Sequence, residues 1–287
     1  MRPLAQILIL ILITTLASFS ENLKKLETLI QEGKVKEALT EADRILSETP
    51  NNRKALACRI DLNVALRKWD HVITDLTKLI KIFPEADQLL IKRAMIHQLN
   101  QKYDKALKDL LAAEKLNPYN ENLCLDKARL FIAQHKVNKA VAELTKTLTV
   151  VPNNVPIRMM RAELWVILHD IDNALVDFNR VLKIEPKNTQ ALNSLAWFMA
   201  TWPDKKYRNG KRSIELATRA CEISEWKNVA IIDTLAAAYA ENNQFDKAVE
   251  YSQKALADSP TELLEELKIR LEMFKQGRPH RETPSLK

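Results

Sequence analysis

The sequence predicts an all-α fold that is built from repeated helical hairpins. Of the 287 residues 46% are hydrophobic and only 3 are glycine, which favours helices and argues against glycine-rich phosphate loops and turn-rich β folds. Five prolines recur at a constant interval, every 34 positions (84 − 50, and so on): Pro50, Pro84, Pro118, Pro152 and Pro186. Such a period is the signature of stacked supersecondary units.

Residues 1–20 have the layout of a signal peptide. Arg2 precedes an apolar stretch from Leu4 to Ala17, and the small residues Ser18 and Ser20 suit a cleavage site. The apolar stretch is shorter than the ~20 residues that span a bilayer. We therefore expect a protein exported to the periplasm or the exterior. The alternative is that residues 4–17 stay uncleaved and anchor the chain in the inner membrane.

The period places about seven helix–turn–helix repeats between residues 21 and 260, each with a helix A and a helix B. Each proline stops a helix B. Small residues stand at one fixed position of helix A (Ala94, Ala128, Ala162, Ala196, Ala236) and one of helix B (Ala38, Ala106, Ala140, Ala174, Ala248), where they let two helices approach closely. The predicted repeats are 21–52, 53–86, 87–120, 121–154, 155–188, 189–228 and 229–260.

The period, the alanine positions and the closing proline resemble the tetratricopeptide repeat. The segments "LNSLAWFMATWPDKKYRNGKRSIELATRACEIS", "IIDTLAAAYAENNQFDKAVEYSQKAL" and "RLEMFKQGRPHRE" further resemble those of exported bacterial tetratricopeptide proteins of planctomycete type. The resemblance implies a right-handed solenoid with a concave face of A helices. It also implies a non-catalytic scaffold that binds proteins.

A charge pattern with a constant spacing links helix A to helix B. Each cation is followed 16 positions later by an anion (41 − 25, and so on): Lys25 with Glu41, Arg59 with Asp75, Arg93 with Asp109, Lys127 with Glu143, and Arg161 with Asp177. In the last two repeats the matching positions are apolar on both sides, Leu195 with Leu216 and Leu235 with Tyr251. Because both positions change from charged to apolar together, we infer that the two side chains are in contact and that the pairs are structural. The alternative is that the cations form a functional row on the surface.

The stretch "TWPDKKYRNGKR" at 201–212 interrupts the period. The small residues Ala196 and Ser213 are 17 positions apart (213 − 196), whereas Ala162 and Ala174 are 12 apart (174 − 162), so the turn between helices A and B is longer by five. We expect Pro203 to end helix A, Asn209-Gly210 to turn, and Arg212 to begin helix B. The insertion marks a repeat subtype, or its cations contact an acidic partner or a headgroup.

After the repeats, residues 261–276 are expected to form a capping helix. Ser259, Pro260 and Glu262 match a capping box, and apolar residues follow at helical spacing: Leu263, Leu264, Leu267, Leu271 and Phe274. A solenoid needs such a helix to cover its last apolar face. Residues 277–287 are expected to be a flexible tail.

The sequence offers no candidate residues for catalysis. We predict that the protein is not an enzyme and that it binds no cofactor and no metal. "NGKRS" lacks the first glycine and the hydroxyl residue of a phosphate-binding loop. His135 and His169 lie in A–B turns without carboxylate or cysteine neighbours. Cys58, Cys124 and Cys221 are best explained as small buried hydrophobes. Nucleic acid is not expected despite a sequence pI of about 9.2, because the cations are dispersed and partly paired.

A partner is expected on the concave face, where one stripe of helix A recurs in every repeat. The candidate residues are Ile91, Met95, Leu125, Arg129, Met159, Glu163, Asn193, Trp197 and Asp233. They suit an extended or helical peptide with apolar anchors. The alternative is an accessory subunit that binds a carbohydrate or an envelope component, with stacking faces from Trp197, Trp202, Tyr207 and Trp226. Membrane contact is expected only if the N-terminal segment is uncleaved.

Overall fold

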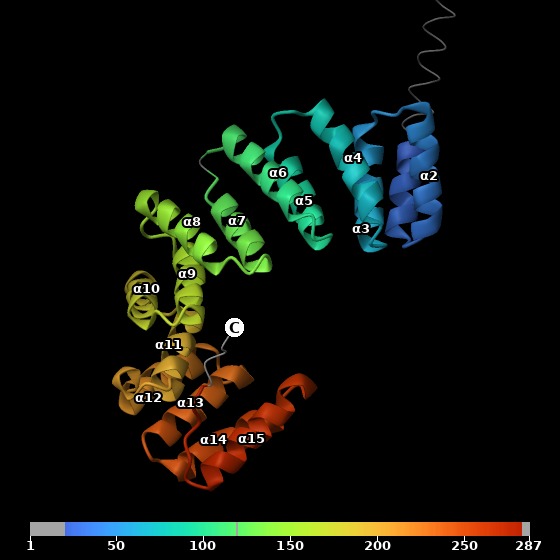
Figure 1. The fold of residues 1–287 in the computed structure, drawn as a ribbon. Coiled ribbons are helices and arrows are strands. Elements are labelled where there is room, and N and C mark those ends of the chain that lie inside the picture. Colours follow the sequence, from blue (N-terminus) through green and yellow to red (C-terminus); the bar gives the residue numbers. More distant parts are fainter. Residues whose placement is uncertain (1–20, 119, 283–287) are drawn as a thin grey trace, which may run out of the picture. The chain divides into compact units, whose positions relative to one another are not determined.

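The structure is a computed structural model that describes residues 21–118 and 120–282 (Figure 1). The predicted signal peptide lies outside these residues. Helices follow one another along the described chain, and no strand occurs in it. The chain forms two compact units, unit 1 ending at Lys136 and unit 2 beginning at Val137. The all-α fold predicted from the sequence is confirmed.

Unit 1 is a series of helical hairpins in which neighbours along the chain pack against each other. Its first A helix covers residues 21–31. The later A helices are α3 (Arg53–Ala65), α5 (Asp87–Leu99) and α7 (Asn122–Ala133). The B helices are α2 (Val35–Glu48), α4 (Trp69–Ile82) and α6 (Tyr103–Leu116).

Unit 2 continues the alternation and adds the interruption and the terminal helix. Its A helices are α9 (Val155–Ile167), α11 (Thr189–Thr201) and α13 (Val229–Glu241). Its B helices are α8 (Val137–Val150), α10 (Ile171–Ile184), α12 (Gly210–Ile223) and α14 (Phe245–Ala257). The short 3₁₀ turns η1 (Lys205–Tyr207) and η2 (Thr261–Leu263) precede α12 and α15 (Leu264–Lys275).

Caps and turns explain why the helices begin and end at a constant spacing. The side chain of an asparagine accepts a hydrogen bond from the backbone three residues later at the start of five helices: Asn52, Asn154, Asn188, Asn209 and Asn228. In the A–B turns a residue with positive φ recurs with the period of the repeat: Gly33, Arg67, Gln101, His135 and His169. His135 and His169 are thus the left-handed residues that end helix A.

The alanines that define the repeat lie where helices cross. All those named above are buried, and most have no exposed surface. Each unit has its own hydrophobic clusters, with Leu56 and Leu76 among the core residues of unit 1 and Phe178 and Leu195 among those of unit 2. A larger side chain at an alanine position would separate the two helices.

Two expectations about where helices begin are wrong. The Ser259 side chain caps no helix: its hydroxyl donates to the carbonyl of Pro260, whose extended backbone (φ −64°, ψ 155°) delays the helix, and α15 begins at Leu264. Helix α12 begins at Gly210 instead of Arg212, because Asn209 provides its cap. Within the predicted tail of residues 277–287, residues 281 and 282 bond to α11. Residues 283–287 lie outside the described part.

Candidate peptide-binding face

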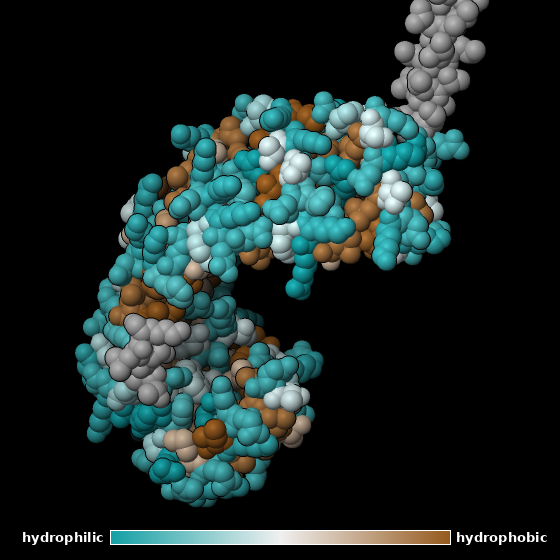
Figure 2. Space-filling model, turned by 45° about the vertical axis from the view of Figure 1, so that its right-hand side comes forward, coloured by the Kyte–Doolittle hydropathy of each residue, from teal (hydrophilic) through white to brown (hydrophobic). Residues whose placement is uncertain are grey.

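In unit 1 the A-helix face carries two exposed apolar side chains on α5. Met95 is 57% exposed and Leu99 is 63% exposed, and a spacing of four places them on one side of the helix (99 − 95). Figure 2 shows such hydrophobic residues as brown patches between hydrophilic ones. Leu99 is not among the predicted residues, because the predicted stripe follows other positions of helix A.

Charged side chains accompany this apolar pair. The Nζ of Lys92 lies 3.0 Å from Oδ1 of Asp61, which joins α5 to α3. On α7 the exposed Arg129 pairs with Asp126 at 2.9 Å. Because these four side chains keep access to water, they can also contact a partner. The face therefore combines an apolar centre with charges of both signs.

Several predicted contact residues are not accessible. Leu125 and Met159 are buried, and Ile91 is half-buried against the cluster of Leu90 and Leu110. Met159 belongs to the same cluster as Leu192 of the next repeat. For Met159 the physical reason is that its position on helix A faces the next hairpin of unit 2 rather than water. Leu125 and Met159 therefore expose little surface to a partner, and the prediction that they contact one stays a prediction.

In unit 2 the predicted residues Asp233 and Trp197 contact the C-terminal part of the same chain. Asp233 is buried and pairs with Arg270 of α15, with Nη2 2.9 Å from Oδ2. Burial raises the pKa of Asp233, while Arg270 opposes this shift. The Arg270 guanidinium also lies 5.5 Å from the ring centre of Trp197. The sequence pattern places Asp233 on an open face, because no local signal indicates that a later helix returns to cover it.

Residues 280–282 occupy the face beside Trp197. The indole Nε1 donates to Oε1 of Glu282 at 2.8 Å, and the His280 ring centre is 5.6 Å from that of Trp197. The backbone N–H of Glu282 donates to the carbonyl of Thr201 at 2.9 Å. Arg281 donates to the carbonyl of Ala200 and pairs with Oε2 of Glu241 at 2.5 Å. The segment therefore satisfies carbonyls that end α11.

The insertion meets the same carboxylate from the other side. Arg208 lies 3.1 Å from Oε1 of Glu241 and also donates to the carbonyls of Trp202 and Pro203. Asn209 donates its backbone N–H to the carbonyl of Met199. Glu241 thus joins the inserted loop to the C-terminal segment. The loop has a structural role at Arg208, whereas Lys205 and Lys211 remain exposed.

Of the remaining predicted residues in unit 2, Glu163 is exposed, whereas Asn193 is not. Glu163 accepts a hydrogen bond from Gln190 at 2.8 Å. Asn193 is half-buried, and its Oδ1 has no hydrogen-bond partner among the described residues. Glu163 can accept a hydrogen bond from a ligand, whereas the Oδ1 of Asn193 is buried. They lie on α9 and α11, one repeat apart.

The aromatic residues named for carbohydrate stacking are engaged within the protein. Trp202 stacks on Phe198 with ring centres 4.5 Å apart, and Phe198 contacts Tyr207 edge-on at 6.3 Å. Trp226 stacks on Tyr251 at 5.9 Å and has the Lys254 ammonium 4.5 Å from its ring centre. Trp202 and Trp226 each therefore have at least one ring face in contact with another side chain of the protein.

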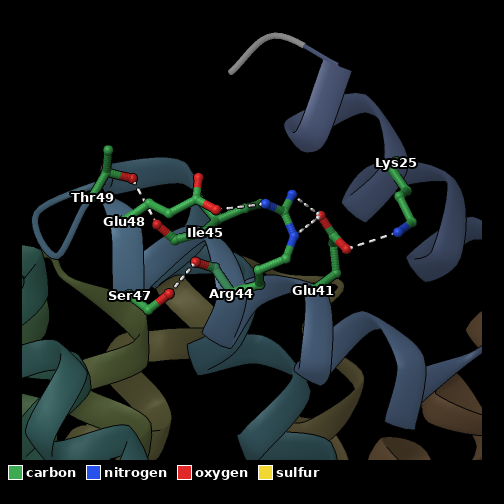
Figure 3. A network of polar contacts seen from close by, with 7 residues as sticks. All are labelled: Lys25, Glu41, Arg44, Ile45, Ser47, Glu48 and Thr49. Atoms are coloured by element: carbon green, nitrogen blue, oxygen red, sulfur yellow. Dashed lines mark hydrogen bonds and ion pairs between the residues drawn. The ribbon is translucent and has the colours of Figure 1, made fainter. Parts of the chain in front are cut away.

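The predicted ion pairs are contacts between helix A and helix B in four of the five repeats. The shortest distances are 2.9 Å for Lys25 and Glu41 and 2.7 Å each for Arg59 with Asp75, Arg93 with Asp109, and Arg161 with Asp177. Glu41 also binds Arg44, as Figure 3 shows. Lys127 lies 2.8 Å from Glu114. Lys127 and Glu143 belong to different units, so this pair stays a prediction.

The arginines make a second contact that the charge pattern does not predict. Each also bonds to a residue on helix B of the preceding repeat: Arg59 to Asp43, Arg93 to Thr77, and Arg161 to Thr145. One guanidinium therefore connects three helices, because its five donors can serve two acceptors. The sequence could have indicated this second contact, because its acceptors Asp43, Thr77 and Thr145 stand at the same position of their repeats.

Possible metal ligands and thiols are the side chains from which the sequence predicts no chemistry. No group of three or more histidine, cysteine, aspartate or glutamate side chains in that part of the chain could hold a metal ion. Cys124 and Cys221 are buried and Cys58 is half-buried, all as thiols. Burial raises the pKa of Cys221 to about 11, which keeps it protonated. Within the same residues no helix is long and apolar enough to span a bilayer.

Comparison with known proteins identifies the fold. No protein-family model and no curated protein matches the sequence. A tetratricopeptide repeat protein from Parabacteroides merdae is similar in structure (TM-score 0.52, 16% identity, 90% of this chain and 99% of that one). So are yeast Tom70 (0.58, 16%, 91% and 59%) and MamA (0.51, 15%, 60% and 94%). With the period and the hairpins described above, these likenesses show that the chain has the tetratricopeptide-repeat fold.

Proposed function

We propose that this protein is a non-catalytic scaffold that binds a peptide segment of a protein partner on the A-helix face of unit 1. The observation that carries the proposal is the exposed pair Met95 and Leu99 on α5, flanked by charges on α3 and α7. Exposed apolar side chains one helical turn apart suit an amphipathic helix or an extended peptide with two anchors. The paired charges around them would fix its orientation.

The choice of unit 1 follows from a difference between the two units. The corresponding face of unit 2 is covered at Trp197, Asp233 and Glu241 by residues of the same chain. Met95 and Leu99 have no such cover among the described residues. The aromatic residues that would support carbohydrate binding are in internal stacks, so we do not propose that function. Export remains a proposal that rests on residues 1–20.

The proposal is tested by capturing partners with the full chain and then changing the face. We expect Met95→Ser combined with Leu99→Ser to reduce partner capture at least tenfold, because two apolar anchors lose their contacts. The matched control is Leu111→Ser, since Leu111 is 44% exposed on helix B of the same unit. If both variants fold and capture the same partners equally, the face is not the binding site.

A further inference from the structure

We infer that the A-helix face of the last two repeats is a second peptide site, and that residues 280–282 of the same chain occupy it. The site fits an extended segment with a cation followed by a carboxylate. A partner segment of this chemistry then binds by displacing the occupant. The inference concerns unit 2 and is independent of the function proposed for unit 1.

The first argument is that the contacts have the form of peptide recognition. Backbone and side chains both take part: the Glu282 N–H bonds to Thr201, its carboxylate accepts from Trp197, and Arg281 bonds to Ala200. Carbonyls at the C-terminal end of a helix attract cations because they carry the negative end of the helix dipole. Such a set of donors and acceptors can recognise two consecutive side chains of an extended segment.

The second argument is that the receiving side is a preformed part of the fold. The carboxylate of Glu241 is also fixed by Arg208, at 3.1 Å, so it keeps its place without Arg281. Trp197 has Arg270 beside its ring, and Arg270 is fixed by Asp233. These residues come from α11, α13, α15 and the inserted loop, none of which belongs to the occupying segment. A site held in this way persists when the occupant leaves.

The third argument is that the occupant is attached through a local turn. Gly277 has φ +66°, a left-handed conformation that favours glycine, and its backbone N–H closes the last turn of α15. Residues 278–282 follow this turn, and Arg278 is exposed. His280 faces Arg270, Arg281, Glu266 and Glu282, and burial lowers its pKa. The backbone N–H of Arg278 still bonds to the carbonyl of Met273 at 2.9 Å, so the residues that follow Arg278 can leave without disturbing α15.

The test uses the full chain with Arg281→Ala and Glu282→Ala, which weakens the occupant and leaves the site intact. The probe is a fluorescent synthetic peptide of residues 277–287, "GRPHRETPSLK". A tethered occupant competes at an effective concentration on the order of millimolar. We therefore expect the opened variant to bind the peptide at least tenfold more tightly than the wild-type chain. A peptide with the same two alanines should not bind.

Further variants separate the site from unspecific binding. In the opened variant, Trp197→Phe removes the donor to the peptide carboxylate and should weaken binding several-fold. The matched control Trp226→Phe changes an indole that stacks on Tyr251, away from this contact, and should leave binding unchanged. An opened variant with unchanged circular dichroism that binds no better than wild type would overturn the inference.

A second measurement serves if the opened variant does not fold. Hydrogen exchange of the wild-type chain should show the Glu282 amide exchanging at least tenfold faster than the amides of α13. Equal rates would mean that the segment leaves only when the last repeat unfolds, and this would overturn the inference. A wild-type dimer that dissociates on replacing Arg281 and Glu282 would assign the occupant to a second copy and overturn occupancy within one chain.

Discussion

At the scale of single residues, the arginines of helix A determine how neighbouring helices are tied together. Arg93 binds both oxygens of Asp109, at 2.7 and 2.8 Å, and its remaining donor reaches Thr77 of the preceding repeat. Asp109 is buried, whereas Arg93 keeps some exposure. The two partners are therefore unequal. Loss of the arginine leaves a buried carboxylate, while the arginine alone can turn toward water.

This inequality gives a first prediction. Arg93→Leu should destabilise the protein by about 3 to 5 kcal/mol, because an uncompensated charge stays buried, and Asp109→Leu should destabilise it less. The double variant should be more stable than the sum of the two effects predicts, since it imitates the apolar pairs of the last repeats. Urea unfolding of all four proteins measures this. Strict additivity would contradict contact between the two side chains.

A second residue prediction concerns His97 on α5, which is buried 3.9 Å from Asp109. Burial lowers its pKa; Asp109 opposes the shift, while Arg93, Lys105 and Lys102 reinforce it. The unfolded chain, with an ordinary pKa of about 6.5, then takes up a proton before the folded protein does. The free energy of unfolding therefore has its full value above that pH. It falls as the pH decreases, by at most about 1.4 kcal/mol per pH unit for one proton.

The measurement is the free energy of unfolding between pH 7.5 and 5.5. His97→Gln should flatten its dependence on pH, because the lowered pKa of this imidazole is its cause. Some dependence remains in this variant, because burial also lowers the pKa of His280. An unchanged slope for His97→Gln would show that this imidazole does not resist protonation in the folded state.

At the scale of elements, the inserted loop is fixed by a close contact between backbones. A Cβ atom at Gly210 would lie 2.8 Å from the backbone nitrogen of Asn242 and 2.9 Å from its Cβ. Such distances require the end of α13 or the start of α12 to move. The glycine is therefore needed for packing, and not only for a turn as the dipeptide Asn209-Gly210 suggests.

We expect Gly210→Ala to lower stability by about 1 to 3 kcal/mol, through overpacking against Asn242. Alanine otherwise favours a helix over glycine, so helix propensity alone predicts the opposite sign. Thermal unfolding of the full chain distinguishes the two. Lys211→Ala is the control, since Lys211 is the next residue of α12 and is exposed. A rise in the midpoint for Gly210→Ala would refute the close contact.

At the scale of the whole molecule, each hairpin is stabilised by packing against its neighbours. In unit 2, α15 covers the last hairpin. Phe274 and Leu267 of α15 are almost fully buried, and the helix packs on α14. In repeat arrays each hairpin depends mainly on its neighbours. Loss of the terminal contact should therefore act locally before it acts on the whole chain.

Phe274→Ala should destabilise the last repeat by about 3 to 5 kcal/mol, because it removes a buried aromatic ring. Hydrogen exchange should then show lost protection in α13 and α14 while α3 and α4 of unit 1 keep theirs. The comparison variant Ile269→Ala changes an exposed residue of the same helix and should leave both regions protected. Uniform loss of protection would mean that the chain unfolds as one cooperative body.

The repeat and its helical hairpins can be predicted from the sequence alone. Their determinants are local or periodic: prolines and alanines recur with one period, and the matched charges of helices A and B keep one spacing. Periodic spacing fixes which side of a helix a residue occupies. The same reasoning locates the insertion and the apolar side of α15.

Which parts of the A-helix face remain open depends on the tertiary structure. Asp233 is covered by Arg270, and Trp197 by Glu282, 85 residues further along the chain. On the same A helices, Leu125 and Met159 are buried. Met95 and Leu99 stand at other positions of the repeat, and their side chains are exposed. No local pattern encodes the contacts of Asp233 and Trp197, because they depend on where the chain returns after its last turn. The sequence therefore predicts a face, and packing at the chain end determines how much of it is available.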